Sequence, residues 1–376
     1  MSGRRYAPQD LEGEEPPQIS PTFGRDLFLE WREPRFGTSN PTDLTNPVWE
    51  WLIKTRKDAY QANEGFNGPP SKEKGPVWCF RRFGQSTTTL TDGRKIYIAG
   101  EHEDHYDPDF YIYNDVVVEN SDGTHLIFGY PKDSFPPTDF HTATQVGTHI
   151  IIIGSLGYRS ERHLNESQIL RLSLKTFEIE KMATTGNGPG WIHEHTAELS
   201  SDCQKIIISG GLIQREDRNY FWENIDEWEL DLSTWSWNRL TDKQWQRWAF
   251  VKKDKTPSHL YRIRAAINIR DYCGKDQFAN ELQKITSELG REPNLDLLPQ
   301  LYRVDDSVKE IPPDEFLTNT FRISIDDLTV RFKEGYSGIS AMVEGKLAPS
   351  RLKALQDSIC IKLNQIHGGE WIVGEP

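Results

Sequence analysis

Cysteine is scarce in this chain of 376 residues, and no two cysteines form a CxxC pair. This spacing excludes a zinc ribbon and a thioredoxin-type redox motif, because both need paired cysteines. The GxSxG, GxxxxGK[ST] and HExxH patterns are absent too, so the sequence offers no serine-hydrolase elbow, P-loop or zinc-protease helix. The cysteines are Cys79, Cys203, Cys273 and Cys360.

Long hydrophobic runs are also missing. The longest, Ile150 to Ile153, falls far short of the ~20 residues that span a bilayer. The first 20 residues have no apolar stretch and carry several acidic side chains, unlike a secretory signal. These absences predict a soluble, reduced, cytoplasmic protein.

Positive charge is in deficit, with 44 Lys and Arg against 57 Asp and Glu and a net charge of −13. Binding to a phosphate backbone or to an anionic membrane needs a basic face, so we expect neither nucleic acid nor membrane as a partner. Aromatic residues make up 11% of the chain, which is enough large apolar surface for a sizeable buried core.

The N-terminal part of the sequence has two sections, a polar one and one that is expected to fold. Residues 1–20 are interpreted as a flexible tail. Residues 21–75 are expected to pack on the rest as a short strand, Leu27 to Trp31, and a helix that begins at Asn46-Pro47 and runs to about Asn63. Asn suits the cap of a helix and Pro its first turn.

Three similar segments follow between residues 82 and 241. Each opens with a polar and a hydroxyl residue, continues into a β-type run, and then has glycine. These glycines, Gly100, Gly154 and Gly210, are 54 and 56 residues apart. A second pair of β-type runs follows in each unit, which predicts four strands per unit.

This pattern resembles the kelch repeat, a β-propeller blade of roughly 50 residues. The resemblance implies that residues 76–243 form kelch-like propeller repeats. A propeller needs ~4–8 blades, so we expect flanking strands, such as Leu27 to Trp31, to complete the ring. The unbroken isoleucine runs suit strands buried on both faces, and they predict that Ile152 and Ile207 are fully buried.

From residue 244 to 376 the pattern changes to an α+β domain. Helices are expected at Ser258–Cys273, Asp276–Leu289 and Pro349–Ile366. Three strands are expected between residues 321 and 343, where apolar residues alternate. The predicted fold is therefore mainly β, a kelch-like propeller with an α+β C-terminal domain.

The stretch from Glu101 to Asp109 is unusually rich in carboxylates and imidazoles. Such side chains are ligands of divalent cations, and a solvated acidic loop is the alternative interpretation. His141 and His195 occupy equivalent places in two repeats, where they either join a metal site or hydrogen-bond a neighbouring strand. The candidate metal ligands are His102, Glu103, Asp104, His105, Asp107, Asp109, His141 and His195.

Trp191 and Trp222 fall in predicted loops and are candidate partner-binding residues, because Trp is enriched at protein interfaces. Some proteins of the kelch type that the chain resembles are enzymes, including copper radical oxidases and sugar isomerases. Nothing in the residues supports a Cys–Tyr cross-link or a copper site. The sequence therefore predicts a non-catalytic module that presents loops to a protein partner, with a metal-dependent enzyme or metal-binding ligand-recognition protein as the alternative.

Overall fold

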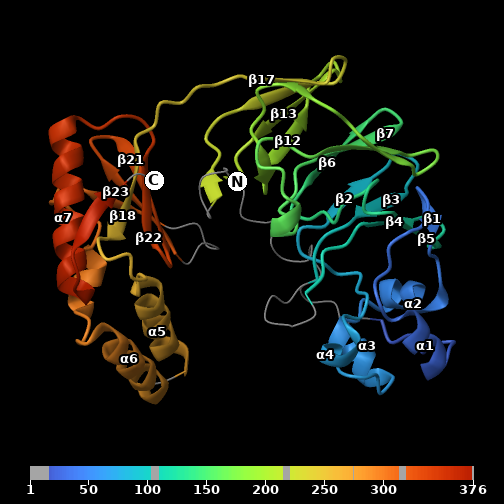
Figure 1. Cartoon of the computed structure of the whole chain (residues 1–376), viewed down its shortest axis with the longest axis horizontal. Coiled ribbons are helices and arrows are strands. Elements are labelled where there is room, and N and C mark those ends of the chain that lie inside the picture. Colours follow the sequence, from blue (N-terminus) through green and yellow to red (C-terminus); the bar gives the residue numbers. More distant parts are fainter. Residues whose placement is uncertain (1–16, 103–109, 215–220, 274, 313–318, 375–376) are drawn as a thin grey trace. The chain divides into compact units, whose positions relative to one another are not determined.

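The computed structural model describes residues 17–102, 110–214, 221–273, 275–312 and 319–374 (Figure 1). The chain is mainly β and divides into two compact units, residues 1–242 and 243–376. The predicted tail lies outside the described residues up to position 16. No helix within the described ranges is long and apolar enough to cross a membrane.

Three antiparallel sheets with four strands in chain order dominate the N-terminal unit. Sheet 1 comprises β2 (Ser86–Thr89), β3 (Lys95–Ile98), β4 (Asp115–Glu119) and β5 (His125–Gly129). Sheet 2 comprises β6 (Thr142–Val146), β7 (His149–Ile153), β8 (Ile169–Ser173) and β9 (Ile179–Lys181). Sheet 3 comprises β12 (Thr196–Leu199), β13 (Lys205–Ser209), β16 (Trp228–Asp231) and β17 (Ser236–Arg239). Each sheet overlaps one repeat.

Short strands extend this arrangement at its margins. β1 (Thr42–Asp43) pairs with β5, and β10 (Thr185–Gly186) pairs in parallel with β17. A small separate sheet consists of β11 (Trp191–His193), β14 (Leu212–Gln214) and β15 (Phe221–Glu223). The predicted opening of the third repeat is therefore divided between β11 and β12.

The first strands of the three sheets are neighbours. β2 lies beside β6, and β6 lies beside β12 (Figure 1). The glycines that follow the second strands of sheets 2 and 3 allow close packing against β11. Gly211 has φ +82°, and a Cβ there would lie 2.5 Å from the carbonyl oxygen of His193. A Cβ on Gly154 would likewise collide with the backbone of Ile192.

Sheet 2 is buried on both faces, because β7 carries isoleucine at four successive positions. Ile150 and Ile152 belong to a hydrophobic cluster shared with sheet 1. Ile151 and Ile153 belong to a second cluster shared with sheet 3. The predicted full burial of Ile152 is confirmed, since its side chain has no exposed surface.

Sheet 3 is buried on one face only, so the prediction for Ile207 is wrong. Ile206 and Ile208 point into the cluster shared with sheet 2, whereas Ile207 is half-buried. Strand side chains alternate between faces. The face that carries Ile207 also carries Lys205 and Glu229, which form an ion pair of 2.9 Å. This face is therefore polar.

The predicted strand Leu27 to Trp31 is also wrong, because the segment is helix α1 (Arg25–Trp31). It contains no β-branched residue, and its Leu and Glu residues favour helix. Phe28 is fully buried and stacks on Phe66 with ring centroids 4.4 Å apart. The segment therefore cannot supply a strand to complete a ring.

The predicted helix from residue 46 to 63 is interrupted. Asn46 caps α2 (Pro47–Thr55) by accepting a bond from the amide of Trp49. Arg56 then adopts a left-handed conformation with φ 54° and ends α2. Asp58 caps α3 (Ala59–Gly65), and α4 (Ser71–Lys74) follows.

These helices cover the outer face of sheet 1. Trp49 and Leu52 of α2 share a cluster with Val117 and Ile127 of sheet 1. Sheet 1 is thus covered by helices on one side, and sheet 3 ends the stack with a polar face. Within the described residues, the three sheets do not close into a ring.

The C-terminal unit is α+β, with a sheet ordered β19-β20-β21-β22-β18-β23. Its strands are β18 (Arg247–Lys252), β19 (Lys309–Ile311), β20 (Thr320–Ile325), β21 (Leu328–Gly335), β22 (Gly338–Val343) and β23 (Trp371–Gly374). Its helices are α5 (Leu260–Cys273), α6 (Lys275–Leu289) and α7 (Pro349–His367). These helices and the three central strands lie where the sequence predicts them, and Leu355, Ile359 and Leu363 of α7 are buried on the sheet's core.

Candidate functional site

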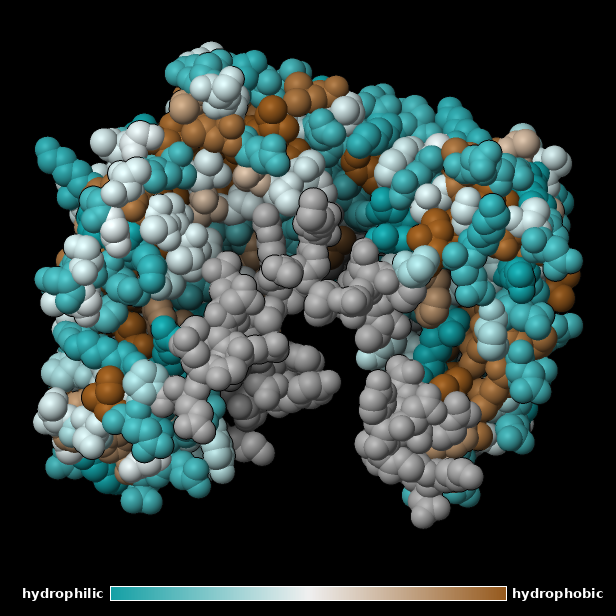
Figure 2. All heavy atoms as spheres, turned by 180° about the vertical axis from the view of Figure 1, so that it is seen from behind, coloured by the Kyte–Doolittle hydropathy of each residue, from teal (hydrophilic) through white to brown (hydrophobic). Residues whose placement is uncertain are grey.

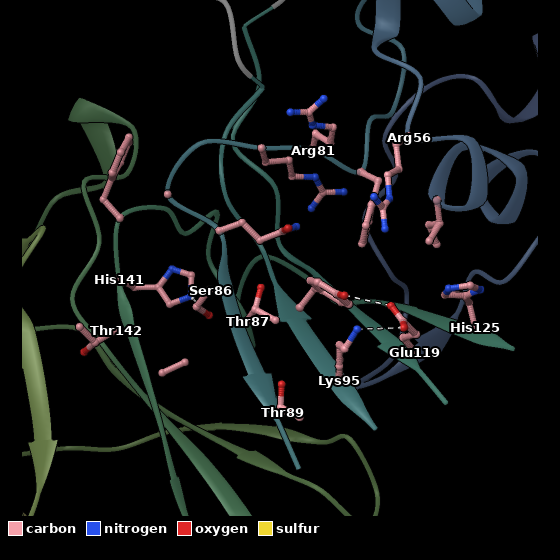
Figure 3. A pocket seen from close by; sticks show the side chains of 18 of the residues that line it. Arg56, Arg81, Ser86, Thr87, Thr89, Lys95, Glu119, His125, His141 and Thr142 are labelled. Atoms are coloured by element: carbon pink, nitrogen blue, oxygen red, sulfur yellow. Dashed lines mark hydrogen bonds and ion pairs between the residues drawn. The ribbon is translucent and has the colours of Figure 1, made fainter. Parts of the chain in front are cut away.

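A pocket of about 740 Å³ lies where the first strands meet (Figure 3). Residues of β2 and β6 line most of one side, and Ala197 of β12 contributes as well. The C-terminal end of α2 and the segment just before β2 supply other lining residues. The pocket is therefore built by the N-terminal unit alone, from all three repeats and the helical segment.

Hydroxyl and imidazole groups from successive repeats are bonded to each other along this side. Ser86 Oγ of β2 lies 2.8 Å from Nε2 of His141, which immediately precedes β6 (Figure 3). Thr142 Oγ1 of β6 lies 2.9 Å from Nε2 of His195, which immediately precedes β12. Each histidine thus ties its own repeat to the first strand of the preceding one.

These two hydrogen bonds, Ser86–His141 and Thr142–His195, are called the histidine ladder below. They bear directly on the predicted metal role of His141 and His195. Both side chains are buried, and each one bonds a hydroxyl of a neighbouring strand, as the structural alternative expected. Burial lowers the pKa of His141 to about 3, so its imidazole is neutral at physiological pH. Among the described residues, no group of three His, Cys, Asp or Glu side chains could hold a metal ion.

Cationic side chains stand on the other side of the pocket. Arg56 follows α2 and Arg81 precedes β2, and both lie in the upper part of Figure 3, opposite the hydroxyls of β2. Lys95 of β3 bonds Glu119 at 3.3 Å, and the Tyr97 hydroxyl bonds the same carboxylate at 2.9 Å. The negative charge of Glu119 is therefore balanced by Lys95 within the pocket wall.

A group of acidic residues adjoins the pocket at Glu194. Burial and the neighbouring carboxyl of Asp139 raise the pKa of Glu101 to about 8. Asp139 is buried and accepts bonds from the amide of Gly157 (2.6 Å) and the hydroxyl of Ser155 (3.2 Å). Glu194 Oε1 lies 3.3 Å from Nδ1 of His193. Asp139 thus has a structural role, because its hydrogen bonds hold Ser155 and Gly157 in place after β7.

His102 occupies a buried polar cluster of its own. Its Nδ1 lies 3.3 Å from both Cys79 Sγ and the Tyr113 hydroxyl. The neighbouring Arg82 forms a buried ion pair with Asp115. The remaining predicted metal ligands of this stretch lie outside the described residues, so their metal role stays a prediction. They are Glu103, Asp104, His105, Asp107 and Asp109.

The two tryptophans proposed for partner binding differ in accessibility. Trp191 is only 5% exposed, and its indole donates to the carbonyl of Leu156 at 3.0 Å. A side chain with so little surface offers almost nothing to a partner, so its burial argues against the predicted role. Trp222 on β15 is half-buried and keeps part of its surface.

Sequence reasoning missed the most useful residues of the site. Arg56 and Arg81 come from segments without repeat character. Glu101 was predicted only as the start of the carboxylate-rich stretch, and Asp139 and Glu194, which it meets in the fold, are far from it in the chain. A signal for the acidic group was present. Each of these three residues lies within two positions of a feature that the repeats share, either the glycine after the second strand or the histidine before the first.

Comparisons with known proteins add little to this geometry. No family model and no curated protein matches the chain. Among solved structures, a fungal alcohol oxidase of the AA5 family, in complex with copper, is 15% identical to it with a TM-score of 0.29. That match covers 46% of this chain and 48% of the oxidase chain. A TM-score this low carries no argument about fold or activity.

Proposed function

We propose that the chain is a non-catalytic recognition module, which holds a segment of a protein partner in the pocket beside β2 and β6. The observation that carries the proposal is the pocket itself. Its volume of about 740 Å³ lies within the range of ligand-binding pockets. Its wall carries polar and apolar groups in similar measure and comes from all three repeats.

We further propose that the three sheets are kelch-like blades. They form an open array of three and not a closed ring. Two features support it. The first strands are neighbours, and the four strands of each sheet follow each other in order from that strand outward. The His141–Ser86 and His195–Thr142 bonds repeat the same link between successive units.

The non-catalytic part of the proposal rests on how the titratable groups are engaged. His141 is neutral and bonded to a hydroxyl, and Asp139 is bonded to backbone and Ser155. On the face shown in Figure 2, hydrophilic residues predominate and hydrophobic ones occur among them in small groups. Recognition through this pocket fits such a surface better than docking through a broad apolar patch.

Blocking the pocket tests the proposal. Thr87 lies on β2, lines the pocket and is half-buried, so Thr87→Trp fills the space with an indole. We expect proteins that co-purify with the tagged wild-type chain to fall about tenfold in quantitative mass spectrometry. Asn238→Trp on β17 is the matched control, because Asn238 is exposed and lies outside the pocket lining. Equal recovery with Thr87→Trp and the wild type would overturn the proposal.

A further inference from the structure

We infer that the C-terminal unit binds a small oxyanion of the phosphate class where α7, β18 and β23 meet. This site goes beyond the proposed function and does not depend on it, because the pocket belongs to the N-terminal unit. β23 lies beside both β18 and α7 (Figure 1). Lys252 is the last residue of β18, His367 the last of α7 and Trp371 the first of β23.

The side chains of these three residues are gathered inside the unit. Lys252 and Trp371 stand directly opposite each other in the β18–β23 pair, so both point to the same face of the sheet. The rings of His367 and Trp371 have centroids 4.9 Å apart, and a Cβ on Gly369 would lie 3.8 Å from Nζ of Lys252. Lys252 is 8% exposed, and His367 and Trp371 are 2% and 4% exposed. An ammonium, an imidazole and an indole are therefore withdrawn from water at one place.

The hydrogen-bond donors of this group lack acceptors. Lys252 forms no ion pair with any residue that the structure describes, and its Nζ bonds the hydroxyl of Thr256 at 3.2 Å. The exposed carboxylate of Asp254 bonds the same hydroxyl at 2.7 Å, so it stands behind Thr256 rather than against the ammonium. Both ring nitrogens of His367 and the indole nitrogen of Trp371 have no hydrogen-bond partner among the described residues. Buried charges and donors without partners are costly, and an anion that accepts from these groups removes that cost.

The chemistry of the donors selects the class of ligand. Burial and the nearby Lys252 lower the pKa of His367 to about 4, so its imidazole is neutral at physiological pH and donates one N–H. The Lys252 ammonium repels a metal cation, and the described part of the chain has no group of three His, Cys, Asp or Glu side chains that could hold one. Donors from three side chains suit an anion with several acceptor oxygens, and lysine binds phosphate as a point charge. The near-complete burial of the donors favours a small ligand.

Calorimetric titration of the full chain with inorganic phosphate, at constant ionic strength, tests the inference. We expect phosphate to bind to the wild type. Lys252→Met keeps the apolar stem of the side chain and removes its charge, so it should weaken binding about tenfold or more. Lys253→Met is the matched control and should leave binding unchanged, because Lys253 is exposed and pairs with Glu370. Phenyl phosphate, titrated in the same way, distinguishes a free anion from the phosphoryl group of a larger molecule, and Lys252-dependent binding of either one supports the inference.

The titration of His367 gives a second readout. A bound anion favours the charged imidazole, so phosphate should raise the pKa of His367 above about 4, as measured by NMR of histidine-labelled protein with His367→Gln to assign the signal. Absence of binding by both phosphates, or an equal loss of binding with Lys252→Met and Lys253→Met, overturns the inference. Binding that survives Lys252→Met shows an adventitious ion only and overturns it too. If Lys252→Met raises the melting temperature while no phosphate binds, water alone serves the donors and the inference fails. None of these results bears on the proposed function.

Discussion

At the scale of single residues, Glu101 combines a raised pKa with burial. Its ordinary pKa of 4.5 applies to the unfolded chain, and its pKa in the fold is about 8. The folded state therefore binds the proton more tightly than the unfolded state does. Below about pH 4.5 both states are protonated, and the free energy of unfolding decreases as pH rises from about 4.5 to about 8.

Glu101→Gln should remove this dependence, because an amide resembles the protonated carboxyl and carries no charge at any pH. We expect the variant to melt about 3 °C above the wild type at pH 8.5 and to match it near pH 4.5. Calorimetric melting temperatures across this range give the comparison. Glu198→Gln, at an exposed position on β12, is the control and should show no such divergence. Parallel curves for Glu101→Gln and the wild type would contradict the assignment of Glu101.

The histidine ladder could be anticipated from sequence, because His141 and His195 precede equivalent strands and Gln85 stands in the same place of the first repeat. The acidic group could not be assembled in that way. Glu101 follows a second strand, whereas Asp139 and Glu194 precede first strands. Their convergence depends on how neighbouring sheets stack, and periodicity within one strand carries no information on that stacking.

At the scale of elements, regular β patterns were predictable and short apolar segments were not. The strands of sheets 1 to 3 were found because glycines and turn residues bound apolar runs of typical strand length. The segment Leu27 to Trp31 is equally apolar. It is buried against Phe66 and α2, however, and it makes these contacts as a helix. The break between α2 and α3 depends on the left-handed backbone of Arg56, which no residue preference indicates.

The two isoleucine strands offer a quantitative test of the sheet arrangement. Ile152 is fully buried between sheets 1 and 2, and Ile207 is half-buried on the polar face of sheet 3. Ile152→Ala should reduce the free energy of unfolding by about 3 kcal/mol, because it leaves a cavity in a packed core. Ile207→Ala should cost about 1 kcal/mol or less. Urea denaturation measures both, and similar costs would show that sheet 3 is covered on both faces.

At the scale of the whole molecule, the sequence repeats indicate how many similar sheets there are. They do not indicate what covers the outer faces of the first and the last sheet. Sheet 1 ends against Trp49 and Leu52 of α2, and sheet 3 ends in a face with the Lys205–Glu229 ion pair. A buried ion pair between two sheets is poorly compensated, so a charged face is suited to water rather than to another sheet. The predicted completion of the ring by Leu27 to Trp31 is wrong, because this segment is helix α1.

The central claim is that the space beside the first strands is where a partner segment binds. Hydrogen exchange of the full chain, with and without the partner that co-purifies with it, tests this claim most directly. We predict slower exchange of backbone amides in β2 and β6, where edge groups become paired or covered, and unchanged exchange in β16 and β17. Protection confined to the C-terminal unit or to the outer strands, with β2 and β6 unaffected, would contradict the account.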